Sequence, residues 1–346
     1  MKLQELIAYK PGKCELYSYE DAPIQPGEIR ARAEFASPKH GTELAHFRGD
    51  DPFLANRFCN ELQLFLPDDQ AKSKPFMMKP GNMWVGAITE IGQNVTNFEI
   101  GQRIAGYGKL RNTHTIKAEN ALIMPPKMTW KQAMCYDPTQ FALGGIRDGN
   151  IRCGDNVAIF GLGAIGLIAA QLAKLSGAAK VIVIDPIECR RKTAIENGAD
   201  FALDPTTCDA GLEIKMLTDK RGADVILETS GTYAALQAAI RGIAYAGNIS
   251  VVGWYKECTK ILDLGREAHF NQPNIIMSRA CSEPNRDYPR WDFKRICEMS
   301  WALLASGALS CENIVDPVVK FQDSAAAYED IVDKNPEKSV KMGVEF

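Results

Sequence analysis

The pattern of hydrophobic and polar positions changes about halfway along the chain. In the first part, short runs alternate between apolar and polar residues and are broken by Gly and Pro, as in residues 28–35 and 101–108. A period of two is typical of half-buried strands. This part therefore predicts a β-rich, barrel-like unit. Residues 48–80 show little regular pattern and predict a long loop with short helices.

From about residue 155, short apolar runs alternate with segments of helical spacing. The runs are 157–160, 181–184, 201–203, 224–228, 249–253 and 275–277; the helical segments are 164–175, 188–197, 210–218 and 232–245, with later amphipathic helices at 294–305 and 324–332. Six strands separated by helices predict a parallel, doubly wound sheet. We expect an α/β protein whose two domains are this sheet and the β-rich unit.

Composition narrows the possible partners and location. The chain has 346 residues, of which 46% are hydrophobic and 24% charged, and a net charge of −3, which gives no electrostatic basis for binding nucleic acid or an anionic membrane. The first residues lack the apolar segment of a signal peptide and no later run reaches membrane-spanning length, so we expect a soluble, cytoplasmic protein. The ten cysteines form no CxxC pair and are expected to be reduced.

A glycine-rich turn carries the strongest chemical signal. Residues 160–166 read Phe-Gly-Leu-Gly-Ala-Ile-Gly, directly after one strand and at the start of a helix, and the next strand ends in Asp185 about 20 residues further on. This is the context of a dinucleotide site, in which the backbone approaches the pyrophosphate and the acid accepts from the ribose. Asp185 favours NAD over NADP, because a carboxylate repels a 2′-phosphate. The expected cofactor-binding residues from this pattern are Gly161, Gly163, Ala164, Ile165, Gly166, Asp185, Arg190, Ser230 and Gly253; for Arg190 a solvated helical turn is the alternative.

Several stretches together resemble the medium-chain alcohol and polyol dehydrogenases over essentially the whole chain. They are 39–43, 81–92, 133–138, the glycine turn and 338–341. The resemblance implies a GroES-like barrel domain formed by residues 1–145 and 280–346, with a Rossmann domain, 146–279, inserted between them. It also implies a homodimer or homotetramer. Lys341 matches a basic residue that binds the pyrophosphate in that family, with an ordinary surface lysine as the alternative.

The chain departs from that family where the catalytic zinc would be bound. The motif that supplies the first ligand reads His40-Gly41-Thr42-Glu43, the second reads Gly81-Asn82-Met83, and the third position is Asp137. Only His40 and Asp137 remain as plausible ligands, whereas a catalytic zinc normally has three. No cysteine lies between residues 60 and 134, so the structural zinc lobe is missing as well. We therefore expect no bound metal ion. The open alternative is a rearranged zinc site formed by His40, Asp137 and an acid from the long loop, such as Glu61.

Without a metal, side chains must hold the alkoxide charge and accept its proton. Lys39 and His40 are the candidates, because a lysine supplies charge and a histidine exchanges protons near neutral pH. Thr42 matches the family's relay hydroxyl, and Asp137 would orient His40 or bind the substrate; His46 is a possible substitute for a missing relay histidine. The competing interpretations are a solvated Lys39, a core His40 and His46, and an Asp137-Pro138 pair that begins a helix.

A closer resemblance is to the D-guloside 3-dehydrogenase group within this family. It rests on PKHGTE, GNM, CYDPTQFA, LGREAHFN and SRACSEPNRDYPRW. It implies NAD-dependent oxidation of a secondary ring hydroxyl, the 3-hydroxyl, of a hexopyranoside. Side chains suited to binding a sugar are Trp84, Tyr107, Gln140, Arg279, Glu283, Asn285, Arg290 and Trp291, with a core aromatic as the alternative for Trp84. The alternatives for the whole protein are a zinc polyol dehydrogenase, an NADPH-dependent enone or quinone reductase, and a nucleotide-sensing binding protein.

Overall fold

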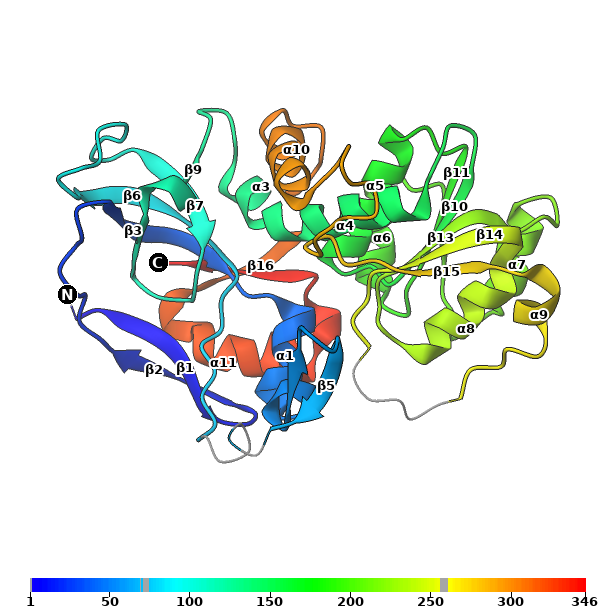
Figure 1. Cartoon of the computed structure of the whole chain (residues 1–346), viewed down its shortest axis with the longest axis horizontal. Coiled ribbons are helices and arrows are strands. Elements are labelled where there is room, and N and C mark those ends of the chain that lie inside the picture. The colour runs from blue at the N-terminus through cyan, green and yellow to red at the C-terminus, as the bar shows by residue number, and fades with distance from the viewer. Residues whose placement is uncertain (1, 69, 71–74, 256–260) are drawn as a thin grey trace. The chain divides into compact units, whose positions relative to one another are not determined.

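The computed structural model describes residues 2–68, 70, 75–255 and 261–346, which form two compact units (Figure 1). Unit 1 comprises Met1–Met134 and Val315–Phe346, and unit 2 comprises Cys135–Ile314. The predicted α/β class and the division into a β-rich unit and a doubly wound unit are confirmed. These units divide at 134/135 and at 314/315, and the domain boundaries predicted from the sequence are 145/146 and 279/280.

Unit 2 contains the parallel sheet that the apolar runs predict. Its strands are β10 (Asn156–Phe160), β11 (Lys180–Ile184), β12 (Phe201–Leu203), β13 (Ala223–Glu228), β14 (Ile243–Val251) and β15 (Asn274–Met277). Their order is β12-β11-β10-β13-β14-β15, and every neighbouring pair is parallel. From β10 the chain first adds strands on one side, β11 and β12, and then on the other side, from β13 to β15. Open α/β sheets bind their ligands beside such a switch point, which here lies between β10 and β13.

Helices cover both faces of this sheet (Figure 1). They are α4 (Tyr136–Gly149), α5 (Ala164–Leu175), α6 (Glu188–Glu196), α7 (Ala210–Leu217), α8 (Tyr233–Gly242), α9 (Glu267–Asn271) and α10 (Phe293–Ala305). Helices α4 and α5 pack together on one face, and α7 and α8 on the other. Helix α8 ends earlier than predicted because β14 already begins at Ile243.

Helix α4 explains why unit 2 begins before the predicted boundary. It lies so close to the sheet that a Cβ on Gly145 would approach a Val252 methyl to 2.6 Å, and one on Gly149 would approach a Val225 methyl to 2.9 Å. A helix in such contact moves with the sheet. A helix that begins at Asp137 was only the alternative interpretation of Asp137-Pro138, and the predicted boundary at 145/146 lies inside α4.

Unit 1 is built on a mixed sheet that the two ends of the chain complete together. Its order is β16 (Val315–Lys320), β17 (Lys341–Glu345), β3 (Glu28–Ser37), β6 (Met83–Ile91), β7 (Arg103–Tyr107) and β9 (Leu122–Ile123), and β8 (Thr113–Lys117) also pairs with β3. A separate hairpin joins β1 (Gln4–Lys10) to β2 (Lys13–Ser18). Because β17 pairs with β3, the C-terminal segment belongs to this unit, as the family resemblance implied.

The remaining elements of unit 1 differ in part from the prediction. They are α1 (His40–Arg48), η1 (Pro52–Leu54), β4 (Asn56–Cys59), β5 (Leu64–Pro67), η2 (Ala118–Asn120), α3 (Trp130–Met134), η3 (Phe321–Asp323), α11 (Ser324–Ala327), η4 (Tyr328–Lys334) and η5 (Pro336–Lys338). The loop prediction is wrong where β4 and β5 pair as an antiparallel hairpin. The predicted helix 324–332 is one α-helical turn that continues as a π-helix.

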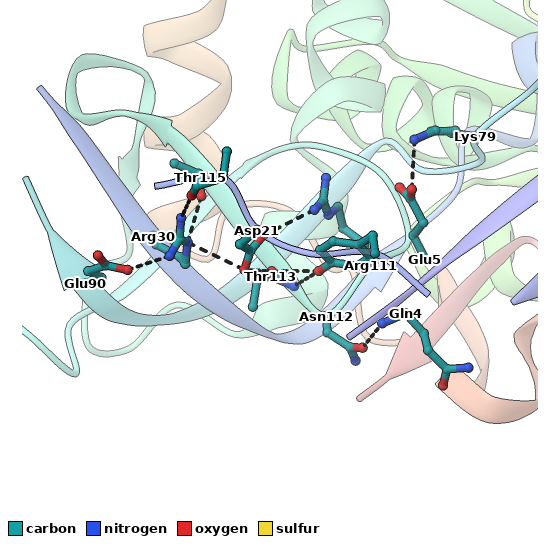
Figure 2. Close-up of polar contacts among 12 residues, drawn as sticks. Gln4, Glu5, Asp21, Arg30, Lys79, Glu90, Arg111, Asn112, Thr113 and Thr115 are labelled. Atoms are coloured by element: carbon teal, nitrogen blue, oxygen red, sulfur yellow. Dashed lines mark hydrogen bonds and ion pairs between the residues drawn. The ribbon is translucent and has the colours of Figure 1, made fainter. Parts of the chain in front are cut away.

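Polar contacts tie the N-terminal segment to the sheet of unit 1 (Figure 2). The Asp21 carboxylate accepts from the Thr113 hydroxyl at 2.7 Å and lies 3.6 Å from the Arg30 guanidinium. Arg30 also contacts Glu90, and Lys79 contacts Glu5 at 2.8 Å. The hydrophobic core of unit 1 includes Leu6, Phe47, Trp84, Ile104, Phe321 and Tyr328. In the part of the chain that the structure describes, no helix is long and apolar enough to cross a membrane.

Candidate active site: a nucleotide loop and the start of helix α1

The glycine turn of unit 2 connects β10 to α5 in the geometry that a dinucleotide site requires. Gly161 has φ +85°, a conformation that side chains with a Cβ rarely adopt, and its amide donates to Ile184 O at 2.9 Å. A Cβ on Gly166 would lie 1.9 Å from Gly161 O, so α5 can begin this close to the turn only with glycine there. A Cβ on Gly163, in contrast, would meet no protein atom within 4 Å. The backbone at Gly163 is therefore open to an approaching ligand.

Asp185 lies at the carboxyl end of β11 and holds the turn in place. Its Oδ2 accepts from the Leu162 amide at 2.7 Å, and its Oδ1 accepts from the Ile187 amide at 2.8 Å. The side chain is only 4% exposed. Each carboxylate oxygen keeps a second acceptor site, so the group that shapes the loop can also receive a ribose hydroxyl. Arg191 donates to Asp185 O at 2.7 Å and pairs with Asp204, whereas Arg190 lies half-buried in α6.

The loops that follow β13 and β14 meet the glycine turn. A Cβ on Gly161 would lie 2.7 Å from Ser230 N, and a Cβ on Gly253 would lie 2.3 Å from Gly231 N. The buried Glu228 joins these loops, because its carboxylate accepts from Ser230 N at 2.8 Å and from the Tyr255 hydroxyl at 2.6 Å. Burial raises the pKa of Glu228, and the hydrogen bonds from Ser230 and Tyr255 oppose that rise.

The glycine turn, Asp185, Ser230 and Gly253 therefore meet at one edge of the sheet, whereas Lys341 belongs to unit 1. Gly163 is the N-cap of α5, so the amides of Ala164 and Ile165 belong to its first turn, where helices hold anions. The open backbone at Gly163 and the surrounding glycines fit the pyrophosphate of a nicotinamide dinucleotide. Such a cofactor supplies hydride transfer when bound. The assignment of individual contacts to each residue stays a prediction.

In unit 1, the candidate catalytic residues stand at the start of α1. Lys39 is its N-cap and His40 its first residue, and both side chains are half-buried. The backbone amide of Met342, in β17, donates to His40 Nε2 at 3.0 Å. A ring nitrogen that accepts a hydrogen bond carries no proton, so neutral His40 has its proton on Nδ1. His40 therefore presents a donor at Nδ1, and Nε2 cannot accept a proton until its bond to Met342 breaks.

Glu43 fixes the backbone around these residues. Its carboxylate accepts from the Gly81 amide at 3.0 Å, from the Lys39 amide and from the Tyr328 hydroxyl at 3.3 Å. It thereby joins the start of α1 to the segment just before β6. Burial raises the pKa of Glu43, and these amides together with the positive charges of Lys109 and Lys341 oppose that rise.

Lys341 belongs to the same cluster. It is 3% exposed, and its Nζ donates to Pro38 O at 2.8 Å. Its ammonium group is thus held one residue before Lys39, inside unit 1. The surface-lysine alternative is wrong for this residue, and its burial lends no support to the predicted pyrophosphate contact.

The other candidate catalytic residues lie apart from this cluster or in the other unit. Thr42 is exposed on the first turn of α1. His46, near the other end of α1, contacts Asp51 at 3.2 Å and stacks on Phe76, which accounts for its ring without a relay role. Asp137 is buried in the first turn of α4, in unit 2, so its predicted pairing with His40 stays a prediction. The cap of α4 is Cys135, two residues before the cap that the alternative interpretation expected.

The residues of unit 1 do not fit the zinc ion that the family resemblance implies. His40 Nε2 is engaged by a backbone donor, Asn82 is an amide, and Met83 is fully buried in the sheet. Thiolate, imidazole and carboxylate are the ligands that hold catalytic zinc. Glu61 lies exposed in the turn between β4 and β5. Among the described residues, no group of three or more His, Cys, Asp or Glu is arranged to hold a metal ion.

Trp84 lies in the core of unit 1 and is fully buried. Its ring stacks on His114 with the centroids 4.3 Å apart, and its Nε1 donates to Tyr107 O at 3.2 Å. An indole covered in this way offers no face to a sugar. The prediction that Trp84 is a sugar platform is wrong in this structure, and the core alternative accounts for its contacts. Tyr107, in contrast, is 48% exposed.

The other predicted sugar-binding residues belong to unit 2, and most have structural contacts. Trp291 lies under two guanidinium groups, with Arg147 Cζ 3.7 Å and Arg295 Cζ 4.3 Å from its ring centre. These contacts occupy the ring that was predicted to stack on a sugar. Glu283 accepts from Phe293 N at 2.6 Å, and Asn285 accepts from Asp287 N at 3.3 Å, so both stabilise turns.

Three further residues of that set differ in exposure. Gln140 is buried in α4 beside Tyr136, to which it is hydrogen bonded. Arg279 and Arg290 are exposed, with contacts to Ser282 at 3.3 Å and to Asp287 at 3.5 Å. Their roles toward a substrate stay predictions.

Asn82, Glu43 and Glu228 are structurally important residues that the sequence analysis did not select. Glu43 stood inside a quoted motif, and Asn82 was treated only as a lost zinc ligand. Glu228 ends a predicted strand two residues before Ser230, and a charged residue in a buried run was the available signal.

Comparison with known proteins agrees with both the fold and the motifs. A family model described as zinc-binding dehydrogenase matches residues 164–296. D-guloside 3-dehydrogenase of Escherichia coli (strain K12) is 50% identical over 350 residues, which cover 99% of this chain and 100% of that protein. The structure of 2R,3R-butanediol dehydrogenase from Bacillus subtilis matches with a TM-score of 0.77 at 20% identity, over 99% of each chain. Galactitol-1-phosphate dehydrogenase from Escherichia coli matches with a TM-score of 0.77 at 18% identity, over 99% of this chain and 100% of that chain.

The two solved structures are at most 20% identical to this chain in sequence, so their similarity supports only the fold. The similarity to D-guloside 3-dehydrogenase extends from end to end, and an identity of 50% places the two chains in one family. The protein is a dehydrogenase that acts on CH–OH groups and belongs to the medium-chain, zinc-binding dehydrogenase family.

Proposed function

We propose that the protein oxidises a secondary ring hydroxyl of a hexopyranoside, the 3-hydroxyl, to a ketone with NAD as hydride acceptor. The observation that carries this proposal is the end-to-end similarity to D-guloside 3-dehydrogenase. The motif around His40 and the absence of a zinc donor set among the described residues of unit 1 support a reaction without a metal ion.

The proton has to reach protein side chains. Oxidation of an alcohol removes a hydride from carbon and a proton from oxygen, and only the hydride goes to the cofactor. The Met342 amide occupies Nε2 of His40, so the ring N–H of the neutral side chain is at Nδ1. A donor at that position stabilises negative charge on the substrate oxygen. Lys39, the residue directly before His40, is then the proposed acceptor of the proton.

The preference for NAD over NADP rests on Asp185. Its carboxylate is held by two backbone amides at the edge of the glycine turn. A fixed negative charge beside the ribose accepts a 2′-hydroxyl and repels a 2′-phosphate. We therefore expect kcat/KM with NAD to exceed that with NADP by about 100-fold.

The test is a survey of glycosides with the purified protein. Methyl glycosides of gluco, galacto and gulo configuration are incubated with NAD or NADP, and the reduced cofactor is followed by its absorbance. The product is identified by NMR. We expect a keto sugar oxidised at carbon 3, with NAD as the preferred cofactor. The corresponding 3-deoxy glycoside is the matched control and should not react.

Three results would contradict the proposal. Failure of all three configurations to reduce either cofactor would exclude glycoside oxidation by this protein. Faster turnover with simple polyols, lost on chelation and restored by zinc, would favour the zinc polyol dehydrogenase instead. Reduction of an enone or quinone by NADPH with no alcohol oxidation would favour the reductase.

A further inference from the structure

Asn82 is a buried polar residue whose backbone is fixed on both sides. Its amide N donates to Ser37 O at 2.9 Å, and its carbonyl accepts from Gly108 N at 3.0 Å. The preceding residue, Gly81, donates to Glu43, and a Cβ on Gly81 would lie 2.3 Å from the Lys109 backbone. The segment therefore cannot shift easily, and the Asn82 side chain starts from a rigid position.

The side-chain oxygen of Asn82 lacks a hydrogen-bond partner among the described residues. The residue is 8% exposed, and its Oδ1 is buried. Buried polar atoms are almost always hydrogen-bonded in folded proteins, and exceptions call for a specific explanation. An acceptor that is held rigidly and left unpaired by the protein is suited to a donor on a ligand.

Backbone contacts connect Asn82 to the candidate catalytic residues within unit 1. Ser37, which receives the Asn82 amide, ends β3 two residues before Lys39. The Ser37 hydroxyl donates to Met342 O at 2.8 Å, and the amide of Met342 donates to His40 Nε2. Three hydrogen bonds, by way of Ser37 and Met342, thus connect Asn82 to His40, and Glu43 joins the same segments.

We propose that Asn82 Oδ1 accepts a hydrogen bond from a hydroxyl of the sugar ring next to the one that is oxidised. This inference rests on the proposed function and names the feature that selects the substrate, a vicinal pair of ring hydroxyls. The reacting hydroxyl gives its proton to a base, so its donor is not available to Asn82. The neighbouring hydroxyl keeps its proton throughout the reaction and can donate it. A simple secondary alcohol lacks this second hydroxyl and leaves Oδ1 unpaired.

The decisive experiment compares Asn82→Ala with the wild-type protein on matched substrates. The substrates are a methyl hexopyranoside and its 2-deoxy and 4-deoxy analogues, each with NAD. For the wild type we expect one of the two deoxy analogues to lose about 100-fold in kcat/KM, because a site built to bind a hydroxyl rejects a substrate without it. In Asn82→Ala, that difference should shrink to about threefold or less.

Three further measurements separate this role from a structural one. Since Oδ1 has no partner within the described protein, Asn82→Ala should keep the thermal unfolding midpoint and the affinity for NAD. Asn82→Asp keeps an acceptor at the same place and should restore part of the discrimination. Asn120→Ala, which changes an exposed asparagine of the same unit, is the control and should match the wild type throughout.

The outcomes are distinct from those of the glycoside survey. If the wild type oxidises no glycoside, the proposed function fails. If it oxidises glycosides but Asn82→Ala retains the full discrimination against both deoxy analogues, the inference about Asn82 is overturned and the proposed function stands. Equal loss of activity on all three substrates would also overturn it, because that result indicates a general effect on the site.

Discussion

The glycine turn of unit 2 and the start of α1 in unit 1 differ in what determines their chemistry. At the turn, backbone atoms form the site: Gly166 packs against Gly161 O, and Gly163 leaves space for a ligand. At α1, side chains determine the chemistry, and those of the family's zinc ligands have been replaced by His40 and Asn82. The backbone of that corner is still held, by Glu43 and by the pairing of Ser37 with Asn82. A site made of backbone keeps its function as long as its glycines remain, whereas a site made of side chains can change its chemistry on the same scaffold.

The largest expected effect tests the side-chain site. Replacing both Lys39 and His40 with alanine should lower kcat for glycoside oxidation by about 10²–10⁴, the usual contribution of general acid–base groups. The affinity for NAD should be unchanged, because the nucleotide turn belongs to unit 2. Steady-state kinetics and a cofactor titration measure the two quantities. Oxidation at the original rate in the double variant would refute a proton acceptor at this corner.

The single variants sharpen that experiment. His40→Asn keeps an acceptor near Met342 N and should cost less than Lys39→Ala if Lys39 takes the proton. The reverse order would assign the base to His40 and would mean that its bond to Met342 breaks during turnover.

The next effect tests the backbone site. In Gly166→Ala, the new Cβ would lie 1.9 Å from Gly161 O, so the turn must open. We expect the affinity for NAD to fall by about 100-fold and the free energy of unfolding to fall by about 1–3 kcal/mol. Fluorescence titration and thermal unfolding measure these changes.

Gly163→Ala is the matched control for the turn. Its Cβ would meet no protein atom within 4 Å, so stability should be retained while the affinity for NAD falls by about 10-fold. Unchanged affinity in this variant would show that the pyrophosphate does not approach Gly163.

Acid should affect unit 1 through His114. Burial, with a smaller contribution from the charge of Arg111, lowers the pKa of His114 from 6.5 to about 3. The unfolded chain therefore takes up a proton near pH 6.5 that the folded protein refuses, and stability falls as the pH drops below 6.5. The loss is about 3 kcal/mol between pH 6.5 and pH 4. In His114→Phe, which keeps a ring to stack on Trp84, this part of the loss should disappear.

Unit 2 gives the contrasting case. Burial raises the pKa of Glu228, which means that the folded state disfavours its charged form. The free energy of unfolding that this group contributes is therefore lost as the pH rises through the folded pKa. Hydrogen exchange measured by mass spectrometry at several pH values would follow the two units separately. If His114→Phe loses protection in unit 1 toward acid as steeply as the wild type, His114 is not the group responsible.

The sequence pattern predicted unit 2 well for two reasons. Its strands are buried on both faces, and the glycines of its turn occupy positions where a Cβ would clash or would block a ligand. The six strands and α5 were found from apolar runs and helical spacing. The start of α4 was considered only as an alternative for Asp137-Pro138, because its first turns carry the polar residues Asp137, Thr139 and Gln140, which the fold buries. Similarly, the β4–β5 hairpin exposes Phe58, Leu64 and Phe65, and exposed apolar residues mask the period of a strand.

The side-chain site was predictable only in part. The motif placed Lys39 and His40 at the start of α1, but the sequence does not show that Met342 occupies His40 Nε2, a contact between residues far apart in the chain. Trp84 and Trp291 were chosen for their chemistry, and the structure covers both rings. Residue type predicts what a side chain can bind, whereas packing decides whether it is accessible.

The smallest expected effect concerns metal. Dialysis against a strong chelator should leave the rate of glycoside oxidation unchanged, and added zinc should not raise it. The reason is the donor set of unit 1: His40 Nε2 is bonded to a backbone amide, and the position of a second ligand carries the amide of Asn82. The same chelation should inactivate a dehydrogenase of this family that has three ligand side chains, which makes it the positive control. Loss of activity on chelation with recovery on zinc would mean that His40 turns away from Met342 to bind metal. The start of α1 would then bind zinc despite its altered donor set, and its chemistry would differ from that of the family less than its side chains suggest.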